Sequence, residues 1–245
     1  MKKTVSVYGY GRFGKLWADI LAEDFHVQVY SRRGLKTEEV SKHLQIVDVE
    51  NLFKCDAIFF CVSISSFEKV LIQSKELFRN NCLYFDTCSV KVMPANWMKA
   101  HLPEKSKIIC THPMFGPDSY HASDTKLPMV MSPIRCSGQE FDYWYTYFNS
   151  KKIRVEKMTP DEHDNMVAYS QGITHYIGRV LADIELKPTL IDTLGYSKLL
   201  GIIEQTCNDT WELFTDLQHY NPYTKKMRKD LHTSIEKIYA ILEKL

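Results

Sequence analysis

Hydrophobic residues in the first 158 positions fall into short unbroken runs that alternate with segments of helical spacing. Unbroken runs of β-branched and aromatic residues are typical of parallel strands covered on both faces. The pattern predicts strands at residues 4–8, 26–30, 45–47, 56–62, 82–85, 107–111, 127–132 and 152–156. Strands that alternate with helices indicate an α/β fold with a doubly wound parallel sheet.

The segments between these strands carry apolar residues three and four positions apart, as amphipathic helices do. We expect helices at residues 15–22, 36–43, 67–78 and 138–149. Ser65 and Ser66 are the predicted caps of the third helix, because a serine hydroxyl accepts hydrogen bonds from free N–H groups at a helix start.

The pattern changes at Pro160, and every later segment has helical periodicity. Breaks are expected near Pro188, Gly195 and Pro222. The sequence therefore predicts a sheet domain over residues 1–158 and a smaller all-helical domain over residues 159–245. Because so few helices build little core of their own, we expect the second domain to pair two subunits into a homodimer.

Composition excludes several classes of protein. With a net charge of +1 and 25% charged residues, the chain offers no bulk attraction to nucleic acid or to an anionic membrane. No apolar run approaches the ~18 residues of a spanning helix, and the first strand leaves no room for a signal peptide. The seven cysteines lack metal-ligand spacing, so we expect no metal site and a reducing, cytoplasmic location.

A glycine-rich turn joins the first predicted strand to the first predicted helix. Gly9, Gly11 and Gly14 form the pattern GxGxxG in the order strand, glycines, helix that a dinucleotide site requires. Gly9 suits the tight turn, Gly11 the approach of a pyrophosphate, and Gly14 the close packing of helix on strand. We therefore expect the first domain to be a Rossmann-type dinucleotide-binding domain.

The end of the second strand bears on the choice of cofactor. A site for NAD would offer an acid to the ribose 2′-hydroxyl there, but the chain has Ser31, Arg32 and Arg33. Guanidinium groups pair with a phosphate through a planar fork of donors, so the sequence predicts NADP. The alternative is a solvated basic turn.

Ligands of such sheets bind at the carboxyl ends of the strands, and the remaining candidates lie at those ends. Ser89 and His112 follow the fifth and sixth strands, where a neutral imidazole can accept a proton near pH 7. By themselves they are equally readable as a helix cap and a core histidine. The expected cofactor contacts are Gly9, Tyr10, Gly11, Arg12, Phe13, Gly14, Ser31, Arg32, Arg33, Cys61, Val62, Ser63 and Thr87.

The chain resembles the prephenate and arogenate dehydrogenase family over nearly its whole length. The motifs that carry the resemblance are Gly9–Gly14, Cys61–Ser63, Asp86–Lys91, Thr111–Pro117, Glu162–Asp164 and Ser170–His175. The runs Ser170–Leu181, Gly195-Tyr196, Asn208-Asp209 and Asn221-Pro222 look most like the plant-type arogenate branch.

The resemblance implies an oxidative decarboxylation, of arogenate to tyrosine or of prephenate to 4-hydroxyphenylpyruvate, with hydride transfer to the nicotinamide. It implies that His112 accepts the proton of the ring hydroxyl, that Ser89 positions that hydroxyl, that His175 contacts the substrate and that Gly116 lines the ring pocket. Glu162, His163 and Asp164, at a helix start, are as easily a capping and surface cluster, and we expect His163 to have a structural role or to lie behind the residues that contact the substrate.

Two departures favour arogenate. The prephenate-specific bacterial branch has histidine where this chain has Gln171, and an arginine that grips a carboxylate after the Gly195 region is missing. Candidates to replace that arginine are Tyr196, Lys198, Lys225, Lys226 and Arg228. Gln171, Tyr196 and Lys198 therefore join His175 and Gly116 as expected substrate contacts. A dehydrogenase acting on a modified prephenate and a non-catalytic NADP-binding regulatory module stay open as alternatives.

Overall fold

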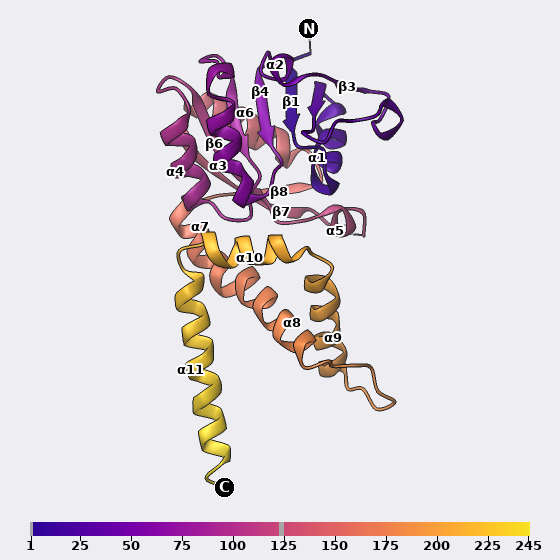
Figure 1. Cartoon of the computed structure of the whole chain (residues 1–245), viewed down its shortest axis with the longest axis vertical. Coiled ribbons are helices and arrows are strands. Elements are labelled where there is room, and N and C mark those ends of the chain that lie inside the picture. The colour runs from indigo at the N-terminus through magenta and orange to yellow at the C-terminus, as the bar shows by residue number, and fades with distance from the viewer. Residues whose placement is uncertain (1, 123–124) are drawn as a thin grey trace. The chain divides into compact units, whose positions relative to one another are not determined.

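The computed structural model describes residues 2–122 and 125–245 (Figure 1). The chain divides into two compact units, residues 1–160 and residues 161–245. The first holds all the strands of the described residues, and the second is helical.

One eight-stranded sheet forms the centre of the first unit, in the order β3-β2-β1-β4-β5-β6-β7-β8. The strands are β1 Thr4–Tyr8, β2 His26–Tyr30, β3 Leu44–Ile46, β4 Ala57–Phe60, β5 Leu83–Asp86, β6 Lys107–Pro113, β7 Leu127–Arg135 and β8 Ile153–Lys157. The order reverses between β1 and β4, whose carboxyl ends therefore border the crevice where such sheets bind ligands. The predicted Rossmann-type sheet, with its helical region after it, is confirmed.

The sheet departs from the all-parallel prediction at one pair, since β7 runs antiparallel to β6. The helix between them, α5 Pro117–Ala122, has six residues and spans about 9 Å. Strand β6 has seven residues and spans about 23 Å. Because α5 is too short to return the chain to the other end of the sheet, the next strand runs back. The hydrophobic pattern of a buried strand does not encode its direction.

The other helices of the first unit connect the strands on both faces of the sheet. They are α1 Arg12–Ala22, α2 Val49–Leu52, α3 Ile64–Gln73, α4 Val92–His101 and α6 Gly138–Asn149, with short 3-10 turns η1 Thr37–Glu39 and η2 Lys75–Leu77. The helix expected at residues 36–43 is wrong, because only η1 forms there. The predicted caps Ser65 and Ser66 are also wrong, since α3 begins at Ile64 with Ser63 as its N-cap.

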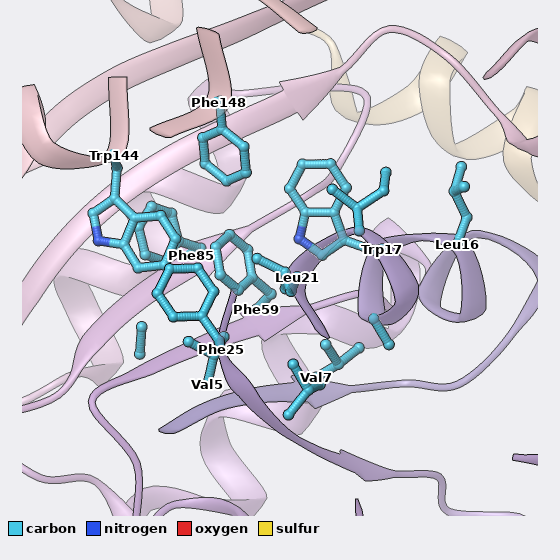
Figure 2. Close-up of a cluster of buried hydrophobic side chains, with 14 of the residues drawn as sticks. Val5, Val7, Leu16, Trp17, Leu21, Phe25, Phe59, Phe85, Trp144 and Phe148 are labelled. Atoms are coloured by element: carbon cyan, nitrogen blue, oxygen red, sulfur yellow. The ribbon is translucent and has the colours of Figure 1, made fainter. Parts of the chain in front are cut away.

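Helices α1 and α6 bury their apolar faces on one side of the sheet. Trp17 of α1 stacks on Phe148 of α6 with ring centroids 5.3 Å apart. Beneath them Phe59 of β4 and Phe85 of β5 stack at 4.2 Å, and Figure 2 shows these rings clustered together. Burial of a large apolar side chain contributes about 1.5–3 kcal/mol, so this aromatic layer holds the strands and their loops in place.

The second unit consists of helices, most of them joined by short turns, with a longer loop at residues 184–193. The helices are α7 Pro160–Val167, the short π-helix η3 Ala168–Gly172, α8 Ile173–Asp183, α9 Leu194–Cys207, α10 Trp211–Tyr220 and α11 Thr224–Leu242. The expected breaks near Pro188 and Pro222 lie between helices. Gly195, by contrast, is the second residue of α9 and does not end a helix. The start of α9 is fixed instead by Thr193, whose hydroxyl accepts a hydrogen bond from the N–H of Tyr196 at 3.2 Å.

Helices α8 and α9 approach each other closely at Gly178. A Cβ atom at this position would lie 2.0 Å from Oγ1 of Thr206, so only glycine fits. Farther along, the Nδ2 group of Asn221, between α10 and α11, donates to the carbonyl of Asp164 at 2.8 Å. Across the part of the chain that the structure describes, no helix is both long and apolar enough to cross a bilayer.

Candidate active site

The glycine-rich turn has two glycines that the fold itself requires. Gly9 has φ +105°, and a Cβ there would lie 2.3 Å from the carbonyl oxygen of Cys61. At Gly14 a Cβ would lie 1.9 Å from the carbonyl oxygen of Gly9. At Gly11, by contrast, an added Cβ would meet no atom within 4 Å in the part of the chain that the structure describes. Gly11 therefore leaves open space at the start of α1, where free N–H groups favour a phosphate.

The other residues of this turn are less available to contact a cofactor, because they are buried or paired. Tyr10 is only 6% exposed, and Phe13 stacks on Trp17 at 5.6 Å, so both contribute to the core. Arg12 donates to both carboxylate oxygens of Asp118, at 3.1 and 2.9 Å. This pair is exposed on both sides and is held only weakly, as surface ion pairs are.

The end of β2 presents two cationic side chains. Arg32 and Arg33 are exposed, and neither forms an ion pair with a residue that the structure describes. The hydroxyl of Ser31 accepts a hydrogen bond from the N–H of Arg33 at 3.4 Å, which shapes the turn. Two unpaired guanidinium groups beside the glycine turn are a suitable partner for a phosphate.

The ends of β4 and β5 are tied together next to this turn. The N–H group of Cys61 donates to the carbonyl of Tyr8, at the end of β1, at 2.8 Å. The Thr87 hydroxyl donates to the carbonyl of Phe60 at 3.0 Å. Cys61, Val62 and Ser63 are each partly exposed along this edge, where the resemblance expects cofactor contacts.

The loop from Asp86 to Lys91 contains a buried ion pair that sequence reasoning missed. Both side chains are fully buried, and the Lys91 ammonium donates to the Asp86 carboxylate and, at 2.6 Å, to the carbonyl of Thr111. The carboxylate also accepts from the N–H groups of Cys88 at 3.1 Å and Thr111 at 3.2 Å. Lysine is almost never fully buried, so nothing in the pattern pointed to this arrangement.

Ser89 lies in the middle of that loop. It is 9% exposed, and its hydroxyl oxygen is buried without a hydrogen-bond partner among the described residues. Ser89 is not the cap of the next helix, because the N-cap of α4 is Lys91. A buried hydroxyl without a partner costs free energy, which a bound ligand would recover.

His112 lies within β6, directly after Thr111, and is 3% exposed. It pairs across the sheet with Val130 of β7. The register of β5 with β6 joins Asp86 to Cys110, so Ser89 and His112 both lie at the carboxyl edge of these two strands. Burial holds the pKa values of the neighbouring Cys88 and Cys110 thiols well above their ordinary value, so neither is a ready nucleophile.

Gly116 lies four residues after His112, just before α5. Its carbonyl oxygen accepts from the Ser119 hydroxyl at 3.1 Å, and its N–H group donates to the same hydroxyl at 3.0 Å. An added Cβ would meet no atom of the described residues within 4 Å, so among those residues this glycine also borders open space.

In the second unit, His175 is buried at 7% exposure on α8. Its Nδ1 atom has no hydrogen-bond partner among the described residues and lies 3.9 Å from Oδ2 of Asp209. Burial lowers the pKa of His175 below its ordinary value, although Asp209 acts in the opposite direction. Gln171, one turn earlier, likewise has a buried amide oxygen without a partner among those residues.

Arg179 follows one turn after His175 on α8, at a four-residue spacing that is visible in the sequence. Its Nη2 group donates to the carbonyl of Asp209 at 2.6 Å, and its guanidinium lies 5.1 Å from the centroid of the Trp211 ring. Arg179 therefore holds the turn between α9 and α10, and with it the Asp209 carboxylate near His175.

Most of the other candidates to bind a substrate carboxylate in this unit already form hydrogen bonds within the protein. Arg228 donates to the side-chain and main-chain oxygens of Gln218, at 2.7 and 3.0 Å, and Lys226 donates to Asp230 at 2.5 Å. The Tyr196 hydroxyl donates to the carbonyl of Lys187 at 2.8 Å, whereas Lys198 and Lys225 are exposed.

The expected surface cluster at residues 162–164 is corrected for two of its three residues, since only Glu162 is exposed. His163 and Asp164 are both fully buried, and the His163 Nδ1 atom lies 2.7 Å from the Asp164 carboxylate. The side-chain amide of Asn221 also donates to the carbonyl of Asp164, which ties the start of this unit to the turn between α10 and α11.

Comparison with known proteins agrees with this geometry. The family described as prephenate dehydrogenase, nucleotide-binding domain, matches residues 23–157, and a TYRAAT1-like C-terminal domain matches residues 180–245. The chain belongs to the prephenate and arogenate dehydrogenase family. The resemblance drawn from the motifs is thereby confirmed.

Individual relatives show the same family. Arogenate dehydrogenases 1 and 2 of Arabidopsis thaliana, both chloroplastic, are each 32% identical to the chain over 96% of its length. The chain spans 38% of the first relative and 68% of the second. Prephenate dehydrogenase from A. aeolicus, solved with hydroxyphenyl propionate and NAD+, has the same fold with a TM-score of 0.77 at 14% identity, covering 100% of this chain and 92% of that one.

Proposed function

We propose that the protein catalyses the NADP-dependent oxidative decarboxylation of arogenate to tyrosine, with prephenate as the second candidate substrate. The observation that carries this proposal is the buried hydroxyl of Ser89, which has no hydrogen-bond partner among the described residues and lies at the same sheet edge as the buried His112. Membership of the family supplies the reaction class, and the two residues supply the proton handling that the reaction needs.

Residues 1–158 are proposed to bind NADP. The open space at Gly11 fits a pyrophosphate at the start of α1, and Arg32 and Arg33 fit a 2′-phosphate. When bound, the nicotinamide supplies the acceptor for a hydride. Its neighbours would be the partly exposed residues at the ends of β4 and β5, including Ser63 and Thr87.

His112 is proposed to accept the proton of the substrate's ring hydroxyl. A neutral imidazole suits this step near pH 7, and Ser89 would hold the same hydroxyl in line with it. Loss of CO2 makes the ring aromatic and supplies the driving force. The protein therefore contributes mainly placement and proton transfer.

Residues 159–245 are proposed to recognise the substrate's side chain and to form the dimer. The Asp209 carboxylate beside His175 is a suitable partner for the ammonium group that arogenate has and prephenate lacks. The exposed apolar side chains of α11, among them Ile235, Ile238 and Tyr239, are the proposed dimer contact. All seven cysteines are free thiols, which suits the proposed cytoplasmic location.

Replacement of His112 by Asn tests the catalytic assignment. We expect kcat to fall by about 10²–10⁴-fold, the usual contribution of a general base, with NADP+ affinity unchanged by fluorescence titration. His26→Asn is the matched control, since His26 is exposed at the start of β2. A variant at His112 with undiminished kcat would mean that another group accepts the proton. A non-catalytic module would show NADP+ binding and no turnover even in the unmodified protein.

A further inference from the structure

The Asp86–Lys91 ion pair closes the loop between β5 and α4 at its two ends. Asp86 is the last residue of β5, and Lys91 is the residue before the first turn of α4. Both side chains have 0% exposure. Ser89 lies between them, so the pair determines the path of the segment that presents its hydroxyl.

The same pair also holds the neighbouring strand. Lys91 donates to the carbonyl of Thr111, the Thr111 N–H donates to Asp86, and the Thr111 hydroxyl donates to the carbonyl of Asp86 at 2.5 Å. His112 is the next residue of that strand. Three hydrogen bonds thus connect the loop of Ser89 to the backbone immediately before His112.

Stability alone does not explain this arrangement. Removing two charges from water costs several kcal/mol per ion, and buried pairs are often replaceable by apolar side chains without loss of stability. An apolar pair would fill the space but would fix neither the loop nor Thr111. Proton transfer, by contrast, requires heavy atoms within about 2.6–3.2 Å, and a misplacement of about 1 Å costs about 100-fold in rate.

Lys91 is not itself an acid or base in the reaction. Burial by itself lowers the pKa of Lys91, but the electrostatic contributions of Asp86, Cys110 and Cys88 together more than offset this effect. The pKa therefore lies above its ordinary value, and the ammonium keeps its proton. Its polar contacts to Asp86 and Thr111 are within the protein.

We propose that Asp86 and Lys91 are positioning residues whose buried ion pair sets Ser89 against His112. This inference rests on the proposed function, because it assigns the pair a role through those two residues. It predicts that the pair affects the chemical step while cofactor affinity and folding stay intact.

The test is the neutral double variant Asp86→Asn/Lys91→Met, which removes both charges and leaves neither partner alone. We expect kcat to fall about 100-fold, with NADP+ affinity by fluorescence titration within about twofold of the unmodified protein. The control is Val70→Ala, a fully buried position on α3 whose truncation lowers stability but leaves kcat unchanged. Undiminished kcat in the double variant would overturn the inference.

A double-mutant cycle with His112→Asn separates positioning from general loss of structure. If the pair acts through His112, the His112 substitution costs less than about tenfold in the Asp86→Asn/Lys91→Met background, against its full effect in the unmodified protein. An equal fall in kcat on His112→Asn in the unmodified protein and in the double variant would contradict the inference.

A milder variant tests the inference if the double variant does not fold. Thr111→Val keeps the ion pair but removes the hydroxyl that donates to the main-chain carbonyl of Asp86, which is one of the three hydrogen bonds between the loop of Ser89 and the strand of His112. We expect about a tenfold fall in kcat with unchanged NADP+ affinity. An unchanged kcat would show that the connection through which the pair is proposed to act does not position the reacting groups, and would overturn the inference. If the unmodified protein turns over neither arogenate nor prephenate, the proposed function fails and this inference with it; turnover with unaffected variants refutes the inference alone.

Discussion

The two units of the chain differ in how completely they bury their own apolar side chains. Among the residues that the structure describes, four large hydrophobic side chains are exposed in the first unit and sixteen in the second. The second unit is also the shorter one. The first unit therefore has a core that specifies its fold by itself, whereas the second carries apolar surface in excess of what a small helical unit can cover.

The buried polar groups do not follow the same division. In the first unit, the charges of Asp86 and Lys91 pair with each other, yet the nearby hydroxyl of Ser89 has no hydrogen-bond partner among the described residues. In the second unit, Gln171 and His175 likewise have buried polar atoms without partners among those residues. A substrate that supplied the missing hydrogen bonds would recover their cost in both units.

The largest expected effect lies in the tightest contact of the first unit. Gly14→Ala places a Cβ against the Gly9 carbonyl at 1.9 Å, and we expect a loss of at least about 4 kcal/mol of unfolding free energy. Gly11→Ala, where space is open, should keep full stability and lose NADP+ affinity. Urea unfolding followed by circular dichroism measures both. Equal stability of the two variants would remove the distinction between fold-required and ligand-required glycines.

The next effect concerns the exposed face of α11. Ile238→Lys puts a charge among Ile235, Tyr239 and Leu242, and we expect the dimer dissociation constant to rise about a hundredfold. Thr233→Lys, on the opposite side of the helix, is the matched control. Light scattering after gel filtration reports the mass of each. A monomer in the unmodified protein at micromolar concentration would leave the excess apolar surface without this explanation.

A moderate effect is expected inside the second unit. Gly178→Ala forces α8 away from Thr206, and overpacking of this kind costs about 1–3 kcal/mol. Adding Thr206→Ala removes the nearest atom, so the double variant should lose less than the sum of the two single variants. Thermal unfolding of the four proteins completes the cycle. Additive losses would show that the two helices adjust freely.

The smallest effect is a pH dependence. Because the pKa of His175 is lowered by burial in the folded state, the unfolded chain, with a histidine pKa of about 6.5, binds the proton more readily. Above the pKa of the unfolded chain, this histidine does not reduce the free energy of unfolding. The free energy of unfolding then decreases as the pH falls from the pKa of the unfolded chain towards the lower pKa of the folded state. Urea midpoints between pH 5 and 8 should show this slope, and His175→Gln should reduce it. An identical slope in both proteins would assign it to other groups.

The sequence predicted the sheet well because buried strands leave an unmistakable apolar pattern. Val5, Val7, Phe59 and Phe85 all lie where that pattern expects them. The direction of β7 was not predictable, because burial is the same for parallel and antiparallel strands. The helix expected at residues 36–43 failed because its polar residues gain nothing from packing, and only Thr37–Glu39 coils.

The candidate site was predictable only in part. Ser89, His112 and His175 were found through position and resemblance, and each proves to be buried. Asp209 and Arg179 were not predicted as site residues, because their positions relative to His175 depend on how α8 packs on α9 and on the turn between α9 and α10. Lys91 was missed because a buried lysine depends on a partner, and the pairing with Asp86 across a five-residue separation appears only in three dimensions.

Steady-state turnover with arogenate and with prephenate, each against NADP+ and NAD+, tests the central claim most directly. The account predicts the highest kcat/KM with arogenate and NADP+, since Asp209 favours an ammonium group and Arg32 with Arg33 favours a 2′-phosphate. Turnover of prephenate with NAD+ as the best pair would contradict both assignments, and turnover of neither substrate with either cofactor would contradict the proposed function itself.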